Sequence, residues 1–233
     1  MLATTNTGKL RELKRILGDA GLDVMSLDVR GLDAVGLSQL QSIKETEIED
    51  IETGSTFAEN ALLKARYYHA LSGLPTIGDD SGLEVDALGG GPGIYSARYA
   101  GPHATDRDRV EKLLRELNTV EAARRGARFV CAAAIVWDAG ERVFVDEARG
   151  RLLDEARGEG GFGYDPIFYY EPLGKTFAEL TEVEKRVVSH RGRAFRQLTR
   201  WLSQSNLLDS TGSSDKIKNP AEDHSASSSR GDL

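Results

Sequence analysis

The sequence predicts a mixed α/β fold, because segments with helical spacing alternate with segments typical of strands. Two apolar stretches, ARFVCAAAIVW and ERVFVDEA, are separated only by DAG and indicate two long paired strands. A threonine followed three residues later by a glutamate, at Thr56 and at Thr181, marks the start of a helix. The chain has 233 residues, 39% of them hydrophobic, which is enough for a sizeable core in one domain or in one domain with a small lobe.

In the first half of the chain, strands and helices are predicted in turn. A short strand ends at residues 6–8, and LRELKRIL after it has its apolar residues at helical spacing. The helix that begins at Thr56 continues to about Ser72. The stretch PTIG, residues 75–78, is typical of a short buried strand, and it leads into an acidic stretch.

In the second half, Thr105 caps a third helix, with apolar residues at 110, 113, 114 and 117 on one face. The two long strands follow. The capping box at Thr181 then opens a short helix, and apolar residues at 195, 198, 201 and 202 line the last one.

Charge and cysteine content exclude several classes of protein. The net charge is −7 and no long basic run offsets it, which argues against a nucleic-acid partner. Cys131 is the only cysteine and lies in an apolar stretch, so we expect a buried thiol, no intrachain disulfide and a reducing, cytoplasmic location. No apolar run approaches the roughly 20 residues that span a bilayer, and the N-terminus has no apolar signal core, so we expect no membrane partner.

The end of the chain differs in composition from the rest. Residues 204–233 are rich in Ser, Asp, Asn and Gly and poor in apolar residues. Too little apolar surface is available there to offset the entropy of ordering. We therefore expect a folded domain over residues 1–203 and a disordered, serine-rich acidic tail over residues 204–233.

The motif TTNTGK, residues 4–9, resembles a phosphate cradle. Small hydroxyl and amide residues turn the chain into a helix whose free N–H groups and dipole favour an anion, and Lys9 adds a full positive charge. It is not a Walker A motif, because Ala3 and Leu10 stand where that motif has Gly and Ser or Thr. An ordinary helix cap is the alternative interpretation.

In GDDSGLEVD, the adjacent acids Asp79 and Asp80 follow the predicted strand. Carboxylates at a strand end suit a hard cation such as Mg²⁺, which takes oxygen ligands. In an extended segment the two side chains point to opposite faces, so we expect only one of them to face a site. Glu52, in the acidic run ETEIEDIETG, is a second candidate ligand. A solvated turn is the alternative.

Two later motifs complete the set. In GEGGFGYDPIF, glycines flank Phe162 and Tyr164, and aromatic rings held this way can stack on a base. In EKRVVSHRG, Lys185, His190 and Arg191 place donors for a base carbonyl or phosphates near one helix start. The alternatives are a loop whose aromatic rings fill the core and a solvated helix face.

Together these motifs describe a nucleotide site, and they resemble the inosine triphosphate pyrophosphatase family, most closely its bacterial branch of dITP/XTP pyrophosphatases. The resemblance spans residue 2 to about residue 201. The matching text, in the order in which the family has it, is LATTNTGKLREL, ETGSTFAENALLKA, DDSGLEVDALGGGPGIYSARYAG, GGFGYDPIF, KTFAELTEVEK and SHRGRA.

The resemblance implies a reaction and an architecture. With Mg²⁺ and water, ITP, dITP or XTP would be hydrolysed to the monophosphate and pyrophosphate by attack at the α-phosphorus, which cleanses the nucleotide pool. The fold would be an elongated mixed β-sheet flanked by helices, with two lobes and the active-site cleft between them. A homodimer is also implied.

The resemblance assigns roles to individual residues. Asp80 would be the general base and would bind the metal together with Glu52. Phe162 would stack on the base, and Lys64 would reach a phosphate. Lys185, His190 and Arg191 would read the oxo group at purine C6. The residues that would contact the substrate are Thr4, Thr5, Asn6, Thr7, Gly8, Lys9, Ser81, Phe162, Gly163, Tyr164, Asp165, Lys185, His190 and Arg191.

The chain departs from the family pattern in four places. Only two residues precede Ala3, where relatives carry a longer first strand. Residues 34–51 form a longer segment than in close relatives, so Glu45 and Glu49 stay open as alternatives to Glu52. The tail has no counterpart in the family. Gly78 stands where relatives usually have Ala, a change that the sequence alone marks as minor.

Two other functions fit the same motifs. One is a house-cleaning pyrophosphatase for another modified nucleotide, such as a modified pyrimidine or dUTP. The other is a non-catalytic nucleotide-binding protein. A serine hydrolase is excluded, because Ser81 lies in GDDSG rather than in G-x-S-x-G.

Overall fold

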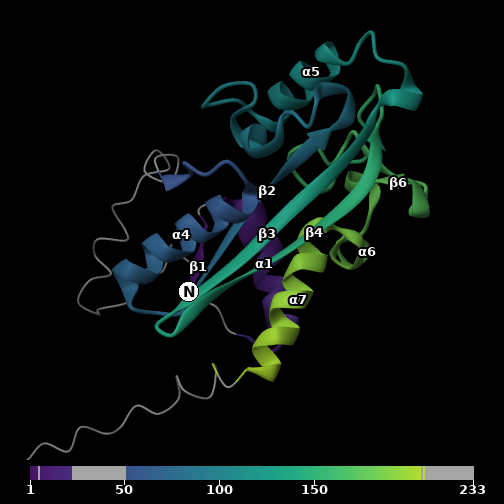
Figure 1. The fold of residues 1–233 in the computed structure, drawn as a ribbon. Helices are drawn as coiled ribbons and strands as arrows, with labels where there is room; N and C mark the ends of the chain where they lie inside the picture. Colours follow the sequence, from purple (N-terminus) through teal and green to yellow (C-terminus); the bar gives the residue numbers. More distant parts are fainter. Residues whose placement is uncertain (5, 23–50, 206, 208–233) are drawn as a thin grey trace, which may run out of the picture.

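The computed structural model describes residues 1–4, 6–22, 51–205 and 207. Their strands form a six-stranded sheet in the order β1-β2-β3-β4-β5-β6, with helices on its faces (Figure 1). The β1–β2 pair is parallel and the remaining pairs are antiparallel. The predicted α/β fold with a mixed sheet flanked by helices is therefore confirmed.

The strands are β1 (Leu2–Ala3), β2 (Thr76–Val85), β3 (Gly126–Trp137), β4 (Gly140–Leu152), β5 (Phe168–Tyr170) and β6 (Lys175–Thr176). The helices are α1 (Thr7–Asp19), α4 (Phe57–Ser72), α5 (Asp106–Glu116), α6 (Glu182–Val188) and α7 (His190–Gln204), and a 3₁₀ helix, η2 (Gly93–Arg98), follows β2. The short strands β5 and β6 are not predicted by the sequence pattern.

The predicted helix starts are confirmed by their caps. The side chains of Thr56, Thr105 and Thr181 each accept a hydrogen bond from the backbone N–H three residues later, at the starts of α4, α5 and α6. The capping box at Thr56 is only half formed. The carboxylate of Glu59 accepts from the backbone N–H of Ser55 at 2.6 Å instead of from that of Thr56.

Strand β2 is longer than predicted, and the prediction that the acid pair lies at a strand end is wrong. Asp79 and Asp80 lie inside β2, where they pair in register with Ala133 and Ala132 of β3. The strand continues because Leu83 and Val85 are fully buried beyond the acids, and because β3 provides hydrogen-bonding partners along the whole length of β2.

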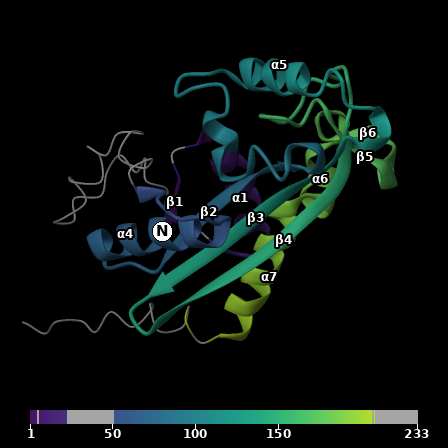
Figure 2. The same ribbon diagram turned by 45° about the horizontal axis from the view of Figure 1, so that its top comes forward.

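The two faces of β3 pack against different helices, which the two views in Figures 1 and 2 show. Val130, Ala132, Ala134 and Val136 pack against α4. The alternate residues Cys131, Ala133 and Ile135 pack against α1 and α7. Cys131 is buried and free, as predicted.

At Gly78, helix α4 lies directly against β2. A Cβ atom at this position would lie 2.3 Å from the carbonyl oxygen of Ala61 in α4, which is closer than any real contact. The absence of a side chain at Gly78 is therefore not a minor change, because an alanine would push α4 away from the strand that carries Asp79 and Asp80.

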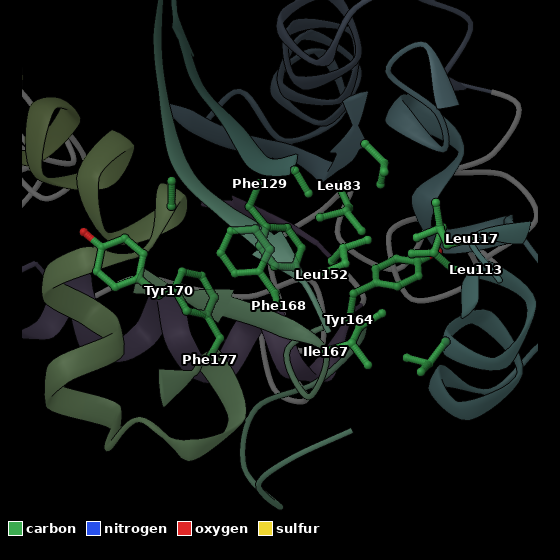
Figure 3. Packing of buried hydrophobic residues seen from close by; sticks show 14 of the residues in the cluster. Leu83, Leu113, Leu117, Phe129, Leu152, Tyr164, Ile167, Phe168, Tyr170 and Phe177 are labelled. Atoms are coloured by element: carbon green, nitrogen blue, oxygen red, sulfur yellow. The ribbon is translucent and has the colours of Figure 1, made fainter. Parts of the chain in front are cut away.

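The far end of the sheet carries a second core, shown in Figure 3. The rings of Phe129 and Phe168 lie 4.7 Å apart, and those of Phe129 and Phe177 lie 5.7 Å apart. Leu113 of α5 and Tyr164 belong to the same cluster. Through Tyr164 this second core supports the glycine-rich loop of residues 158–165. None of the helices in the described ranges is long and apolar enough to cross a membrane.

Candidate active site

The predicted phosphate cradle lies where β1 turns into α1. Asn6 is the N-cap of α1, and its side-chain oxygen accepts from the backbone N–H of Lys9 at 2.9 Å. The hydroxyl of Thr4 accepts from the backbone N–H of Asn6 at 3.3 Å. Thr7 and Gly8 form the first turn of α1, where backbone N–H groups have no partner inside the helix. Thr5 lies outside the described residues.

The two acids of β2 point to opposite faces of the sheet, as predicted. Asp79 pairs with Lys9 of α1 at 2.8 Å and lies 3.4 Å from Nε of Arg191 of α7. Asp80 faces α4, where Nζ of Lys64 lies 3.2 Å from its Oδ1. Asp79 and Asp80, although adjacent in the sequence, thus belong to different clusters of charged side chains.

This difference moves the pKa values of the two carboxyl groups in opposite directions. Burial alone would raise the pKa of Asp79, but Lys9 and Arg191 outweigh it and hold that pKa far below its usual range. Burial raises the pKa of Asp80, which Lys64 counteracts only in part. The Oδ2 atom of Asp80 is buried and has no hydrogen-bond partner among the described residues.

Glu52 and Asp80 converge on Lys64. Nζ of Lys64 lies 2.6 Å from Oε1 of Glu52, and Arg98 lies 3.4 Å from the other oxygen of Glu52. Burial would lower the pKa of Lys64, but the two carboxylates, that of Asp80 first, raise it, so the lysine is charged. Glu45 and Glu49, the alternatives to Glu52, lie outside the described residues.

These carboxylates are compatible with a hard cation. The Oδ2 atom of Asp80 has no hydrogen-bond partner among the described residues, and Glu52 lies across Lys64 from Asp80. In the part of the chain that the structure describes, no group of three or more His, Cys, Asp or Glu side chains is arranged to hold a metal. Two protein carboxylates suit Mg²⁺, which keeps several waters and takes further ligands from substrate phosphates.

The loop of residues 158–165 presents Phe162 toward Lys185 of α6 and Arg191 of α7. Nζ of Lys185 lies 4.9 Å from the centroid of the Phe162 ring, and the guanidinium carbon of Arg191 lies 5.5 Å from it. The ring also approaches Gly8, where a Cβ atom would lie 3.0 Å from it. A side chain at this glycine of the cradle would therefore require the ring to shift by a few tenths of an ångström.

The backbone of the loop is held by buried groups. The carboxylate of Asp165 accepts from the backbone N–H of Phe162 at 2.8 Å and from Nζ of Lys185 at 2.6 Å. Tyr164 is buried in the second core, and its hydroxyl donates to the carbonyl oxygen of Ser96 at 2.9 Å. Tyr164 thus anchors the loop, and Phe162 is the ring left at its surface.

The cationic donors form a buried cluster around Glu12 of α1. One carboxylate oxygen of Glu12 accepts from Lys185 and the other from Nη1 of Arg191, both at 2.6 Å. Arg191 is 2% exposed and also donates to the hydroxyl of Ser81 at 2.7 Å. Burial would raise the pKa of Glu12, but Arg191 and Lys185 outweigh it and lower that pKa.

His190 completes the cluster as a neutral group. Its ring stacks on Phe129 with centroids 4.7 Å apart and an angle of 11° between the planes. Burial lowers its pKa well below the usual value, and the nearby cations Arg191 and Lys185 add to this effect. Its Nδ1 atom is buried and without a hydrogen-bond partner among the described side chains and backbone.

Two cavities meet at Phe162. The larger, of about 630 Å³, is bordered by the cradle residues Asn6, Thr7 and Gly8. The smaller, of about 80 Å³, is bordered by Lys9, His190 and Arg191. Both are bordered by Asn6, Asp106, Phe162 and Lys185, so residues of the predicted cradle, the ring and one of the predicted donors border both cavities.

Comparisons with known proteins agree with this arrangement. A sequence model described as Ham1 family matches residues 1–201. The chain belongs to the Ham1 family.

Three proteins to which this chain is similar show the extent of the match. The chain is 48% identical over 199 residues to a dITP/XTP pyrophosphatase of Yersinia pseudotuberculosis, covering 84% of this chain and 93% of the relative. A dITP/XTP pyrophosphatase of Streptomyces avermitilis is 48% identical over 200 residues, covering 85% and 94%. The structure of the Staphylococcus aureus Ham1 protein matches with a TM-score of 0.72 at 38% identity, covering 87% of this chain and 97% of that one.

The Ham1-family site contains residues that the sequence motifs did not single out. Glu12 holds two of the predicted donors, and Asp106 borders both cavities. Asp79, which the sequence offered only as one of two adjacent acids, joins Lys9 to Arg191. A glutamate at the edge of the apolar face of the predicted first helix was the available signal for Glu12. Lys64, which the resemblance expects to reach a phosphate, pairs in this structure with Glu52 and Asp80.

Proposed function

We propose that this Ham1-family protein hydrolyses the non-standard purine nucleoside triphosphates ITP, dITP and XTP to the monophosphate and pyrophosphate. The observation that carries the proposal is the cavity of about 630 Å³, which is bordered by the cradle residues, Phe162 and Lys185. That volume lies within the range of small-molecule sites, roughly 300–1,000 Å³. A ligand with phosphates at one end and an aromatic base at the other matches these walls. The names of the relatives support the same activity.

The triphosphate would bind at the start of α1. The free N–H groups of the first turn and Lys9 favour an anion there. Glu52 and Asp80 would hold Mg²⁺, which when bound supplies charge neutralisation on the phosphates and lowers the pKa of water. In the free protein, Arg98 and Lys64 limit the repulsion between the carboxylates of Glu52 and Asp80.

Asp80 would be the general base. Its unpartnered Oδ2 atom is available to accept a proton from the attacking water. The water oxygen then forms a bond to the α-phosphorus while the bond from that phosphorus to the bridging oxygen breaks. Pyrophosphate leaves with the electron pair, and Lys9 stabilises the negative charge that develops on the phosphates.

The base would be selected by the donors beside Phe162. Lys185 is held charged, because its carboxylate partners Asp165 and Glu12 outweigh the effect of burial and raise its pKa. A charged donor matches the oxo group at C6 of hypoxanthine or xanthine, and the 6-amino group of adenine would place two buried donors against each other. Phe162 would stack on the base face, a contact worth roughly 1–3 kcal/mol.

The wider context stays part of the proposal. We expect a homodimer, a cytoplasmic location, and no nucleic-acid or membrane partner. The match of the family to residues 1–201 supports a catalytic domain over residues 1–203. The predicted tail, residues 204–233, lies almost wholly outside the described residues.

A substrate panel tests the proposal. We would measure kcat/KM of the purified full chain for ITP, dITP, XTP, ATP and dUTP with Mg²⁺. The proposal predicts that the three 6-oxopurine substrates exceed ATP and dUTP by at least about a hundredfold, the discrimination that mispaired buried donors produce. Equal turnover of ITP and dUTP would contradict it, and tight binding of ITP without turnover would favour a binding protein.

A further inference from the structure

The loop that carries Phe162 is attached to helix α5 by one carboxylate. Oδ2 of Asp106, the first residue of α5, accepts from the backbone N–H of Gly163 at 2.6 Å. Gly163 directly follows Phe162 and has a positive φ of 63°. The bond joins residues 57 positions apart in the sequence, so it connects two elements that the chain alone does not hold together.

Asp106 is itself held in place from the α5 side. Its other carboxylate oxygen forms an ion pair with Arg109 one turn later in the helix. Nη1 of Arg109 donates to the carbonyl oxygens of Ala97 and Ala104, both at 2.7 Å. The start of α5 and the end of η2 therefore form one hydrogen-bonded unit, and Asp106 projects from it toward the loop.

Two consecutive amides around the Phe162 ring are fixed by two carboxylates from different elements. Asp165 accepts from the N–H of Phe162, and Asp106 accepts from the N–H of Gly163. Asp165 is fixed in turn by Lys185. Together these bonds determine the direction of the backbone at Phe162, and hence where its ring lies between the two cavities.

We infer that Asp106 is a positioning residue that sets the Phe162 ring for stacking on the base. The inference deepens the proposed function and rests on it. Asp106 borders both cavities, yet its carboxylate is satisfied by Gly163 and Arg109, so it acts through the loop and not as a catalytic residue. Loss of the Gly163 bond would widen the range of ring positions, which weakens binding of the base more than it slows the chemical step.

Three variants of the full chain separate this role from a general one in α5. Asp106→Ala removes the acceptor for Gly163. Asp106→Asn keeps a carbonyl oxygen that can accept from Gly163 but loses the charge opposite Arg109. Asp108→Ala is the matched control, because it removes an equal charge and the capping box with Thr105 from the same helix turn without touching the loop.

Steady-state kinetics with ITP give the first readout. We expect Asp106→Ala to raise KM roughly tenfold, as for loss of one hydrogen bond to a half-exposed charged acceptor, with kcat changed less than about threefold. Asp106→Asn and Asp108→Ala should keep KM within about threefold of the wild-type value. A KM for Asp108→Ala that rises as far as that for Asp106→Ala, or a fall in kcat alone, would overturn the inference.

Amide hydrogen exchange in the free protein gives a readout that needs no activity. The N–H of Gly163 should exchange faster in Asp106→Ala than in wild type, while Asp108→Ala leaves it protected and exposes only the start of α5. Equal exchange at Gly163 in both variants would overturn the inference. If the wild-type protein turned over no ITP, the proposed function would have failed, and the exchange comparison would still decide whether Asp106 holds the loop.

Discussion

The substitution Glu12→Gln tests the buried cluster of charges around Glu12. Glu12 is 24% exposed and accepts from Lys185 and from Arg191, both at 2.6 Å. A glutamine keeps one acceptor oxygen but turns an NH₂ group toward the other cation. It also removes one of three carboxylates, those of Glu12, Asp79 and Asp165, that balance the three cations Lys9, Lys185 and Arg191.

The expected loss of stability follows from burial and from the remaining partners. Removing one member of a buried pair costs about 3–5 kcal/mol. Here both cations keep another carboxylate, and Glu12 is partly exposed, so we expect a loss of about 2–3 kcal/mol from the free energy of unfolding. That corresponds to a shift of roughly 1 M in the urea midpoint.

Urea unfolding of wild type and variant at pH 7 measures the loss, with Glu182→Gln as the control. Glu182 is 68% exposed and pairs with Arg15 on the surface, so its replacement should cost less than about 0.5 kcal/mol. Because the pKa of Glu12 is lowered in the folded protein, its contribution is present above the unfolded value of about 4.3 and is lost as the pH falls through the folded value. A loss no larger than that of Glu182→Gln would refute the account of this cluster.

Two further predictions concern the reaction, and a third concerns the pH dependence of stability. Asp80→Asn should nearly abolish turnover of ITP and leave ITP binding largely intact; loss of binding equal to the loss of rate, measured by titration, would contradict the role of base. Phe162→Ala should mainly raise KM for ITP, by roughly tenfold if about 1–2 kcal/mol of stacking is lost, and an unchanged KM would remove this ring from the base contact. Burial lowers the pKa of His190, so the free energy of unfolding should fall as the pH drops below about 6.5, by up to about 1.4 kcal/mol per pH unit. In urea unfolding between pH 5 and 7, His190→Gln should lack this slope.

Local signals in the sequence predicted the helices well. The starts of α4, α5 and α6 were predictable because a threonine cap and the residue three positions later interact within one turn. The opposite orientation of Asp79 and Asp80 was predictable because side chains alternate along an extended chain. At Thr56 the box is incomplete because Ser55, which precedes the cap, competes for the same glutamate.

What the sequence could not predict depends on contacts between distant residues. The length of β2 is determined by its pairing with β3, about fifty residues away, so the acids appeared to follow the strand. The pairing of Glu12 with Lys185 joins residues 173 positions apart, and that with Arg191 joins residues 179 positions apart. The tether from Asp106 to Gly163 is of the same kind, since a helix-start aspartate is normally explained by its own helix.

The measurement that tests the central claim most directly is the phosphorus product released from ITP. The full chain would be incubated with ITP, and in parallel with ATP, with and without Mg²⁺, and pyrophosphate and inorganic phosphate would be quantified separately. Attack at the α-phosphorus predicts metal-dependent release of pyrophosphate from ITP and little product from ATP. Release of inorganic phosphate from ITP would mean attack at the terminal phosphorus and would contradict the account.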